Sequence, residues 1–215
     1  MSIEELSVAG SVRLKGPIKL GVIRVSGSLS ADGDIEAEVL HTSGSMAVAG
    51  NLKAKEIRIS GSLAVRGDAE AGDLDISGSA RITGSLEAGE IRISGKLTAP
   101  EIKAETIEVS GKIVSRTITA RKIRIRKKSR VEGEIRACEV IVEREAEADT
   151  IIAERVEVER KAEVDKIIAE RVTIRRDAYV KELEYVEGEI APGAEIDNVK
   201  KVTEPPKLEH CSPNQ

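Results

Sequence analysis

The chain has almost no aromatic side chains. Its 215 residues include two Tyr and neither Phe nor Trp. Proteins that bind single-stranded nucleic acids stack the bases on aromatic rings, and solenoid proteins that act on carbohydrates commonly use such rings for sugars. The composition therefore argues against both of these functions, and nucleic acid is not an expected partner.

Histidine is equally scarce, with His41 and His210 as the two copies. A solenoid zinc enzyme of the carbonic anhydrase type needs three His ligands on one metal, which this chain does not supply. The hexapeptide-repeat acyltransferases place a catalytic His in a groove between subunits, but His41 has no loop around it. The acidic residues are scattered, and no glycine loop cradles a phosphate. We therefore predict no enzyme activity, no catalytic residue, no cofactor and no metal site.

Cysteines and long apolar runs are also few. Cys138 falls at a predicted corner and Cys211 in the C-terminal tail, so we do not expect them to pair, which suits a reducing compartment. No apolar run reaches the 18 residues of a membrane-spanning helix, and Met1 to Leu6 lead into the first predicted strand without a signal peptide. We predict a cytoplasmic protein, with the inner face of the membrane as an alternative location.

What the sequence does have is a short repeat, with a period of 16 or 17 residues. The copy at 57–71 reads Ile-Arg-Ile-Ser-Gly-Ser-Leu-Ala-Val-Arg-Gly-Asp-Ala-Glu-Ala. A short fixed period is typical of a solenoid. The copies begin at Leu6, Ile23, Leu40, Ile57, Leu74, Ile91, Ile107, Ile123, Val140, Val156 and Val172, with a partial copy at Gly188.

Each copy contains three apolar-x-apolar pairs, which is the alternation of a strand with one buried face. Three such strands per period predict an all-β, single-domain, three-faced (triangular) parallel β-helix, a β-solenoid of about twelve coils. We expect a short lead at 1–5, the β-helix at 6–199 and a disordered tail at 200–215. The third strand of successive coils carries an unbroken series of inward alanines, flanked by Leu20 and Tyr185: Ala37, Ala54, Ala71, Ala88, Ala104, Ala120, Ala137, Ala153 and Ala169.

Glycine marks the predicted corners, where a tight turn favours positive φ. One series follows Ser in successive coils, as at Gly44 and Gly61. A second series occurs only in coils of 17 residues, so we interpret it as an optional bulge, with several of its members at positive φ. This second series comprises Gly16, Gly33, Gly50, Gly67, Gly84 and Gly133.

The second half of the chain replaces its Ser-Gly corners with charged ones, such as Lys127, Arg144, Arg160 and Arg176. Opposite charges that ladder between coils in solvent are one interpretation, and a lateral contact surface is the other. One basic cluster is a candidate patch for an anionic partner, either lipid or phosphate, unless neighbouring acidic coils offset its charge. The cluster consists of Arg121, Lys122, Arg124, Arg126, Lys127, Lys128 and Arg130.

The ends of the predicted solenoid are candidate self-association sites, because an uncovered strand edge is a template for another chain. Five residues precede coil one, too few for a cap, whereas Pro192 and a polar tail are expected to break and cap the last coil. At the N-terminal end the candidates are Leu6, Val8, Val12, Leu14, Ile18 and Leu20. At the C-terminal end they are Tyr185, Ile190, Ile196 and Val199.

The phrase at 57–72 and its echoes at 23–39 and 74–90 resemble the bactofilins, a family of polymer-forming cytoskeletal proteins. The resemblance covers residues 6–125 best, and it reaches the charged half only through the period. It implies a right-handed triangular β-helix that stacks end to end, without nucleotide, into nonpolar filaments that act as scaffolds. It also implies that the main partner is a second copy of the chain, with other scaffold proteins as further partners and membrane contact left open.

Two functions therefore remain. The first is a structural, cytoskeletal scaffold that self-associates through its open β-helix ends. The alternative is a non-polymerising β-solenoid rod, either a monomer or a head-to-head dimer, that displays a charged surface to a protein partner.

Overall fold

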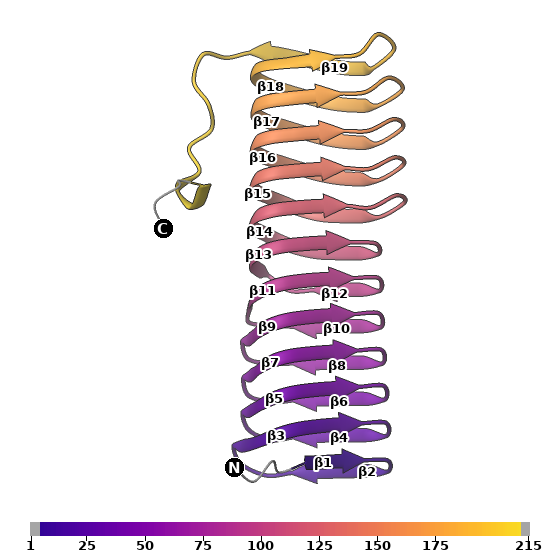
Figure 1. Cartoon of the computed structure of the whole chain (residues 1–215), viewed down its shortest axis with the longest axis vertical. Coiled ribbons are helices and arrows are strands. Elements are labelled where there is room, and N and C mark those ends of the chain that lie inside the picture. The colour runs from indigo at the N-terminus through magenta and orange to yellow at the C-terminus, as the bar shows by residue number, and fades with distance from the viewer. Residues whose placement is uncertain (1–4, 212–215) are drawn as a thin grey trace. The chain divides into compact units, whose positions relative to one another are not determined.

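The computed structural model describes residues 5–211, and they form a β-solenoid of about twelve turns (Figure 1). Nineteen strands cover these described residues, and the registered pairs are parallel. Within the same range the only helical segment is the 3-10 helix η1 (Glu209–Cys211). The predicted all-β parallel solenoid is confirmed, while the triangular cross-section and the right-handed sense stay predictions.

The chain divides into two compact units, residues 1–103 and 104–215. In the first unit, from β2 onward, strands of three or four residues alternate with strands of eight or nine. These strands are β1 (Glu5–Val8), β2 (Ser11–Leu14), β3 (Ile18–Val25), β4 (Ser28–Ala31), β5 (Ile35–Thr42), β6 (Ser45–Val48), β7 (Leu52–Ile59), β8 (Ser62–Val65), β9 (Ala69–Ile76), β10 (Ser79–Ile82), β11 (Ser85–Ile93) and β12 (Lys96–Thr98), and β13 (Glu101–Val109) begins there.

The second unit has longer strands, because each runs through two corners without interruption. They are β14 (Lys112–Ile125), β15 (Arg130–Val142), β16 (Glu147–Val158), β17 (Glu163–Ile174), β18 (Tyr179–Ile190) and the shorter β19 (Glu195–Lys201). After β19 the chain turns back alongside the second unit and ends its described part in η1, which contacts β14 and β15 (Figure 1). The predicted domain boundaries stay predictions: the lead at 1–5 falls largely outside the described residues, as do residues 212–215 of the tail.

Alternation of apolar and polar residues explains why these segments are strands. In β5, Ile35 and Ala37 are buried, and so are Leu40 and Thr42. Two consecutive residues between these pairs are not buried, so the phase of the alternation shifts within the strand. The next buried pair lies in β6, so each coil directs three pairs inward, as the repeat predicts.

The inward alanine series is confirmed. Within the first unit Leu20 is in register with Ala37, and the series continues through Ala54, Ala71 and Ala88 in the following coils. Within the second unit the series continues from Ala120 through Ala169 and ends on Tyr185. All of these alanines are 7% exposed or less except Ala104, which is partly exposed. Small side chains at this position let the third strand lie close to the axis of the solenoid.

The glycine corners are formed as expected but for a different reason. Gly44 and Gly61 do not have positive φ. A Cβ added at either would come closer than 3.0 Å to the backbone of the preceding coil, a distance that real Cβ atoms essentially never show. Each coil follows the last so closely at this corner that only a residue without a side chain fits there. The predicted left-handed conformation is therefore wrong for this series, and close approach of the backbones is the cause.

The second glycine series is mixed. Gly133 has φ 123° and lies where the pairing of β15 shifts register, so the predicted bulge is confirmed there. Gly16 also has positive φ, at 78°. At Gly33, Gly50, Gly67 and Gly84 φ is not positive, so the positive φ predicted for several members of this series is found only at Gly16 and Gly133. At these positions a Cβ would again collide with the coil before.

Pro192 does not break the last coil, contrary to the sequence-based expectation. Residues 191–194 form the same four-residue turn as the four preceding coils, closed by Ala194 N–H donating to the Ala191 carbonyl at 3.1 Å. Strand pairing continues on both sides of the turn, from Ile174 with Ile190 to Tyr179 with Glu195. The fixed φ of proline suits the second position of such a turn, and Gly193 takes the positive φ at the third.

Candidate functional site

The N-terminal edge of the first unit comprises β1, β2 and residues 18–20 of β3. Among the described residues, β1 pairs only with β3, β2 only with β4, and 18–20 only with β5. The predicted association residues lie on this edge: Val8 is 4% exposed, and the other five are partly exposed. Their registered partners one coil further are all buried, so the missing neighbour on one side explains the exposure. The five are Leu6, Val12, Leu14, Ile18 and Leu20.

The C-terminal edge of the second unit is more polar. β19 pairs with β18 alone among the described strands, and its outward residues are charged or amide side chains. Val199 is 53% exposed, while Tyr185, Ile190 and Ile196 are partly exposed. At this edge Tyr179 Oη donates to Asp197 Oδ2 at 2.6 Å, which raises the pKa of the Tyr179 phenol. The structure thus brings the predicted C-terminal residues to one edge, and their role in association stays a prediction.

The basic cluster is a ladder of ion pairs within the second unit. Six of its seven side chains lie within 4.0 Å of a carboxylate, usually one on a neighbouring coil, and Lys127 contacts Glu143 through its backbone N–H at 3.2 Å. The hydrogen bond from Arg126 to Glu108 raises the pKa of that guanidinium. The pairs are Arg121–Glu105, Lys122–Glu139, Arg124–Glu143, Arg126–Glu108, Arg126–Glu143, Lys128–Glu145, Arg130–Glu132 and Arg130–Glu147.

The same pairing continues through the rest of the second unit. Lys166 pairs with Glu182 and Arg171 with Glu187, each across adjacent coils. Exposed pairs of this kind contribute little individually, because water and salt screen them. The interpretation of laddered opposite charges is therefore confirmed, while the anionic-partner patch stays a prediction.

A second ladder, at the corner of the first unit, was missed by the sequence analysis. Asp34 Oδ1 accepts from Asn51 N–H at 2.7 Å, and Asn51 Oδ1 accepts from Asp68 N–H at 2.9 Å. Asp68 Oδ1 accepts from both the N–H and the hydroxyl of Ser85, at 2.7 and 2.9 Å. These bonds lower the pKa of the Asp68 carboxyl, with the backbone N–H of Ser85 as the largest cause. The signal was present as a Gly-Asp, Gly-Asn, Gly-Asp, Gly-Ser series at intervals of 17.

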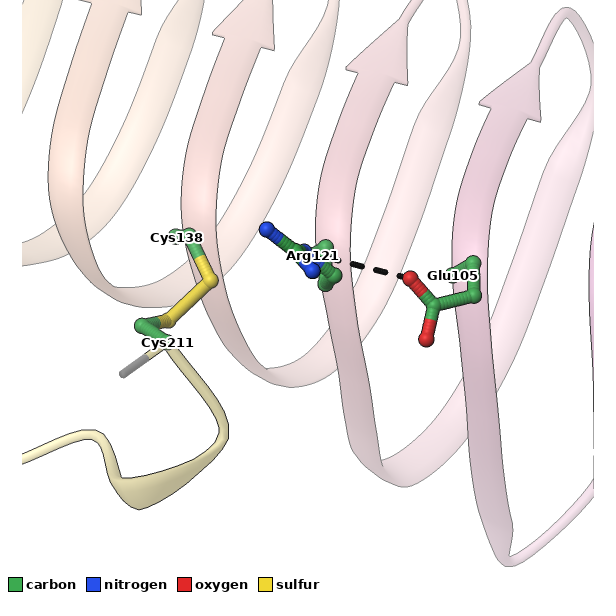
Figure 2. The surroundings of a disulfide bond; sticks show 4 residues. All are labelled: Glu105, Arg121, Cys138 and Cys211. Carbon is green, nitrogen blue, oxygen red and sulfur yellow. Dashed lines mark ion pairs between the residues drawn. A yellow bond between two sulfur atoms is a disulfide. The ribbon is translucent and has the colours of Figure 1, made fainter. Parts of the chain in front are cut away.

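The two cysteines form a disulfide, so the expectation that they would not pair is wrong. Cys138 lies in β15 and Cys211 in η1, 73 residues later, with their Cα atoms 5.4 Å apart (Figure 2). The C-terminal tail, expected to be disordered, packs against the second unit in its described part: Leu208 is buried and η1 contacts β14 and β15. A chain that returns over four coils brings together residues that no local pattern relates.

The two histidines have different surroundings. In the first unit His41 Nε2 lies 3.3 Å from Glu56 Oε1 and 3.2 Å from Arg58 Nη1. In the second unit the Nε2 atom of His210 is buried, and no described group hydrogen-bonds to it. The sulfur atoms of Cys138 and Cys211 and a ring nitrogen of His210 all lie within 4.8 Å of one another. No local pattern in the sequence relates these three residues, and no metal site was predicted there.

No helix in the described part of the chain is long and apolar enough to cross a membrane.

Comparison with protein families gives one match. Residues 4–99 match the bactofilin model, whose description is "polymer-forming cytoskeletal". The first unit is a bactofilin domain. The matched range ends close to the boundary at residue 103, and the charged second unit lies beyond it.

The resemblance drawn from the repeated Ser-Gly phrases is thus confirmed for the bactofilin domain. Neither the curated proteins nor the solved structures include a match to the chain. Because the family is polymer-forming and cytoskeletal, the domain supports a cytoskeletal scaffold.

Proposed function

We propose that the protein is a scaffold that self-associates through the edge strands of its β-solenoid. The observation that carries this proposal is the N-terminal edge of the bactofilin domain. Among the described residues, the strands at this edge have a partner on one side only, and five aliphatic side chains are partly exposed. The family description as polymer-forming supports the same conclusion.

Two forces act at such an edge. Unpaired N–H and C=O groups can form a parallel or antiparallel ladder with a second copy. Complete burial of an aliphatic side chain contributes about 1.5–3 kcal/mol relative to full exposure, and several are partly exposed together at Val12, Leu14 and their neighbours. Both forces are available without hydrolysis, so assembly proceeds without a nucleotide.

The kind of assembly that forms depends on which edges of the solenoid associate. Contact between two N-terminal edges is isologous and closes at a dimer. If the edge formed by β19 also associates with its own copy, alternating contacts extend into a nonpolar filament. The regular turn at 191–194 supports this second contact, because β19 remains paired in register with β18. Val199 is its most exposed large apolar side chain.

Electron microscopy of the purified protein without nucleotide tests the proposal. We expect filaments from the unaltered chain, and their loss when Val12 and Leu14 are both replaced by Lys. Both side chains are partly exposed at the edge, so the change opposes association with little effect on the core. Val8, which is 4% exposed, is not altered because its replacement would damage coil one.

The control is Ser11→Lys, which places a single positive charge on the outward side of the same strand. Filaments should persist in this variant. Filaments that survive the Val12→Lys and Leu14→Lys double replacement would show that the contact lies elsewhere. Light scattering separates a closed dimer from a polymer, and Val199→Lys tests whether the second edge extends it.

A second candidate is a non-polymerising solenoid that displays its charged unit to a protein partner. The regular ladder of charged side chains on β15 to β18 favours it, because such a surface offers alternating signs at a fixed spacing. Cosedimentation with anionic vesicles tests the basic cluster and with it a location at the inner face of the membrane. A monomer or dimer in all conditions, with vesicle or protein binding that salt reverses, would favour this second function.

A further inference from the structure

The cluster of Cys138, His210 and Cys211 lies outside the proposed association edges. Cys138 is at a corner of β15, and the His210–Cys211 pair arrives in η1 from the end of the described chain. One ligand atom from each of the three residues lies within 4.8 Å of the other two. A thiol pair with an adjacent imidazole is a donor set that zinc and other soft divalent metals prefer.

Packing as well as the disulfide holds this cluster together. Leu208 is 8% exposed, and η1 contacts both β14 and β15. The Nε2 atom of His210 is buried without a hydrogen-bond partner among residues 5–211, although a buried polar atom normally has one. A ring nitrogen held in this way is free to donate its lone pair to a metal.

We propose that the reduced form of the protein binds one Zn²⁺ ion through the thiolates of Cys138 and Cys211 and the imidazole of His210. In tetrahedral zinc sites the Zn–S and Zn–N distances are about 2.3 and 2.1 Å, which separates the ligand atoms by roughly 3.4–3.8 Å. All three donor atoms lie within 4.8 Å of one another, and after reduction the two sulfur atoms would have to move apart from bonding distance to reach the separation in a zinc site. The fourth position stays open to water.

The same residues thus have two states. In thiol–disulfide exchange, two molecules of a small thiol such as glutathione reduce the disulfide, yielding two cysteine thiols and one oxidised glutathione. Zinc then replaces the two thiol protons, which are released to water, and no electrons move in that step. Oxidised glutathione reverses the exchange and expels the metal.

The charges around the cluster suit this chemistry. Arg121 is on the coil before Cys138, and Figure 2 shows its side chain between the disulfide and Glu105. A guanidinium beside a thiolate stabilises its negative charge. Glu139, Glu154 and Glu170 line a surface depression together with Cys138, Arg155 and Arg171, so carboxylates outnumber guanidiniums beside Cys138.

Cobalt titration of the full chain tests the proposal. The protein is reduced with a phosphine, freed of metal with a chelator, and titrated with Co²⁺ without oxygen. We expect one Co²⁺ per chain, with the thiolate-to-cobalt charge-transfer band and the visible bands of a tetrahedral site, and displacement by Zn²⁺. Oxidation to the disulfide should abolish both the bands and the binding.

Three variants make the test specific. Cys138→Ser should remove the thiolate band, and His210→Gln should weaken Co²⁺ binding at least about tenfold while the oxidised protein still forms its disulfide. His41→Gln, in the other unit, is the matched control and should bind as the unaltered chain does. Circular dichroism checks that each variant is folded.

Two results would overturn the site. In one, the reduced protein binds Co²⁺ no more tightly than Cys138→Ser. In the other, His210→Gln leaves the affinity and spectrum unchanged. Neither result depends on filament formation, so this inference and the proposed function succeed or fail separately.

Discussion

The two units form the equivalent corner between successive strands of the solenoid in different ways. In the bactofilin domain the corners consist of Ser-Gly pairs, and the coils approach so closely that a Cβ at Gly61 would overlap the coil before. In the second unit the equivalent corner is a four-residue turn, closed for example by Ala162 N–H donating to the Glu159 carbonyl at 3.2 Å. Its third residue takes positive φ although it is not glycine, as at Lys161 with φ 59°.

The difference shows that two factors can restrict which residues form a solenoid corner. One is the space available to a Cβ beside the preceding coil, and the other is the backbone φ that the turn requires. At a space-limited corner one position excludes every side chain, so that position is restricted to glycine. A torsion-limited corner admits charged side chains, which then pair between coils, and it accepts a strain of order 1 kcal/mol at each left-handed residue. The second unit therefore carries charged side chains at the corner where the first unit requires a glycine.

The largest effect should come from the disulfide, which belongs to the second unit alone. In metal-free buffer, reduction should lower the free energy of unfolding of residues 104–215 by up to about 4 kcal/mol, because the bond closes a long loop in the unfolded chain. The first unit should be unaffected. Hydrogen exchange followed by mass spectrometry resolves the two units, and Cys138→Ser should reproduce the loss. Equal destabilisation of both units would contradict this prediction.

The next effect separates crowded from open glycine corners within the first unit. Gly61→Ala places a Cβ against the backbone of the preceding coil and should destabilise by about 1–3 kcal/mol. Gly10→Ala is the matched control, since nothing lies within 4 Å of its added Cβ, and it should change stability by less than about 0.5 kcal/mol. Chemical denaturation measures both. Equal effects would mean that crowding is not what selects glycine.

A smaller effect, of the opposite sign, is expected in the second unit. Lys161→Gly removes the cost of positive φ and should stabilise the protein by up to about 1 kcal/mol, after the greater freedom of glycine in the unfolded chain is subtracted. The equivalent residue of the last turn is already Gly193, with φ 89°. Arg160→Gly, one residue earlier and without positive φ, is the control and should destabilise by about 0.5–1 kcal/mol. Thermal unfolding of the two variants measures both effects, and destabilisation by Lys161→Gly would refute the prediction.

The smallest effect concerns pH and the hydrogen-bonded ladder of the first unit. The folded pKa of Asp68 lies below its unfolded value, so its contribution to stability is complete above the unfolded pKa and is lost as the pH falls through the folded pKa. Asp68→Asn keeps the acceptor oxygen, as Asn51 does one coil earlier, but does not titrate. The variant should therefore lose less stability than the unaltered chain below about pH 4. Urea unfolding across that range measures the difference, and identical profiles would exclude a role for Asp68.

Much of the fold could be predicted because the repeat is local. The alternation within one copy, as in Leu52–Ile59, specifies which side chains point inward, and the interval of 17 specifies which residue lies next to which. The alanine series and the edge residues such as Val12 follow from those two facts. The torsions at Gly33 and Gly67 could not be predicted, because glycine serves both positive φ and close approach, and the sequence is the same for either.

By itself, then, the sequence determined the period, the inward pairs and the identity of the strands at each edge, because these depend on residues close together in the chain. The tertiary structure alone decided the pairing of Cys138 with Cys211, the position of His210 beside them, and the partners of the basic cluster. These depend on how far the chain returns after β19 and on which carboxylate the next coil presents. The return of the chain and the choice of carboxylate each depend on distances of a few ångströms between segments far apart in the sequence. Local sequence patterns do not show those distances.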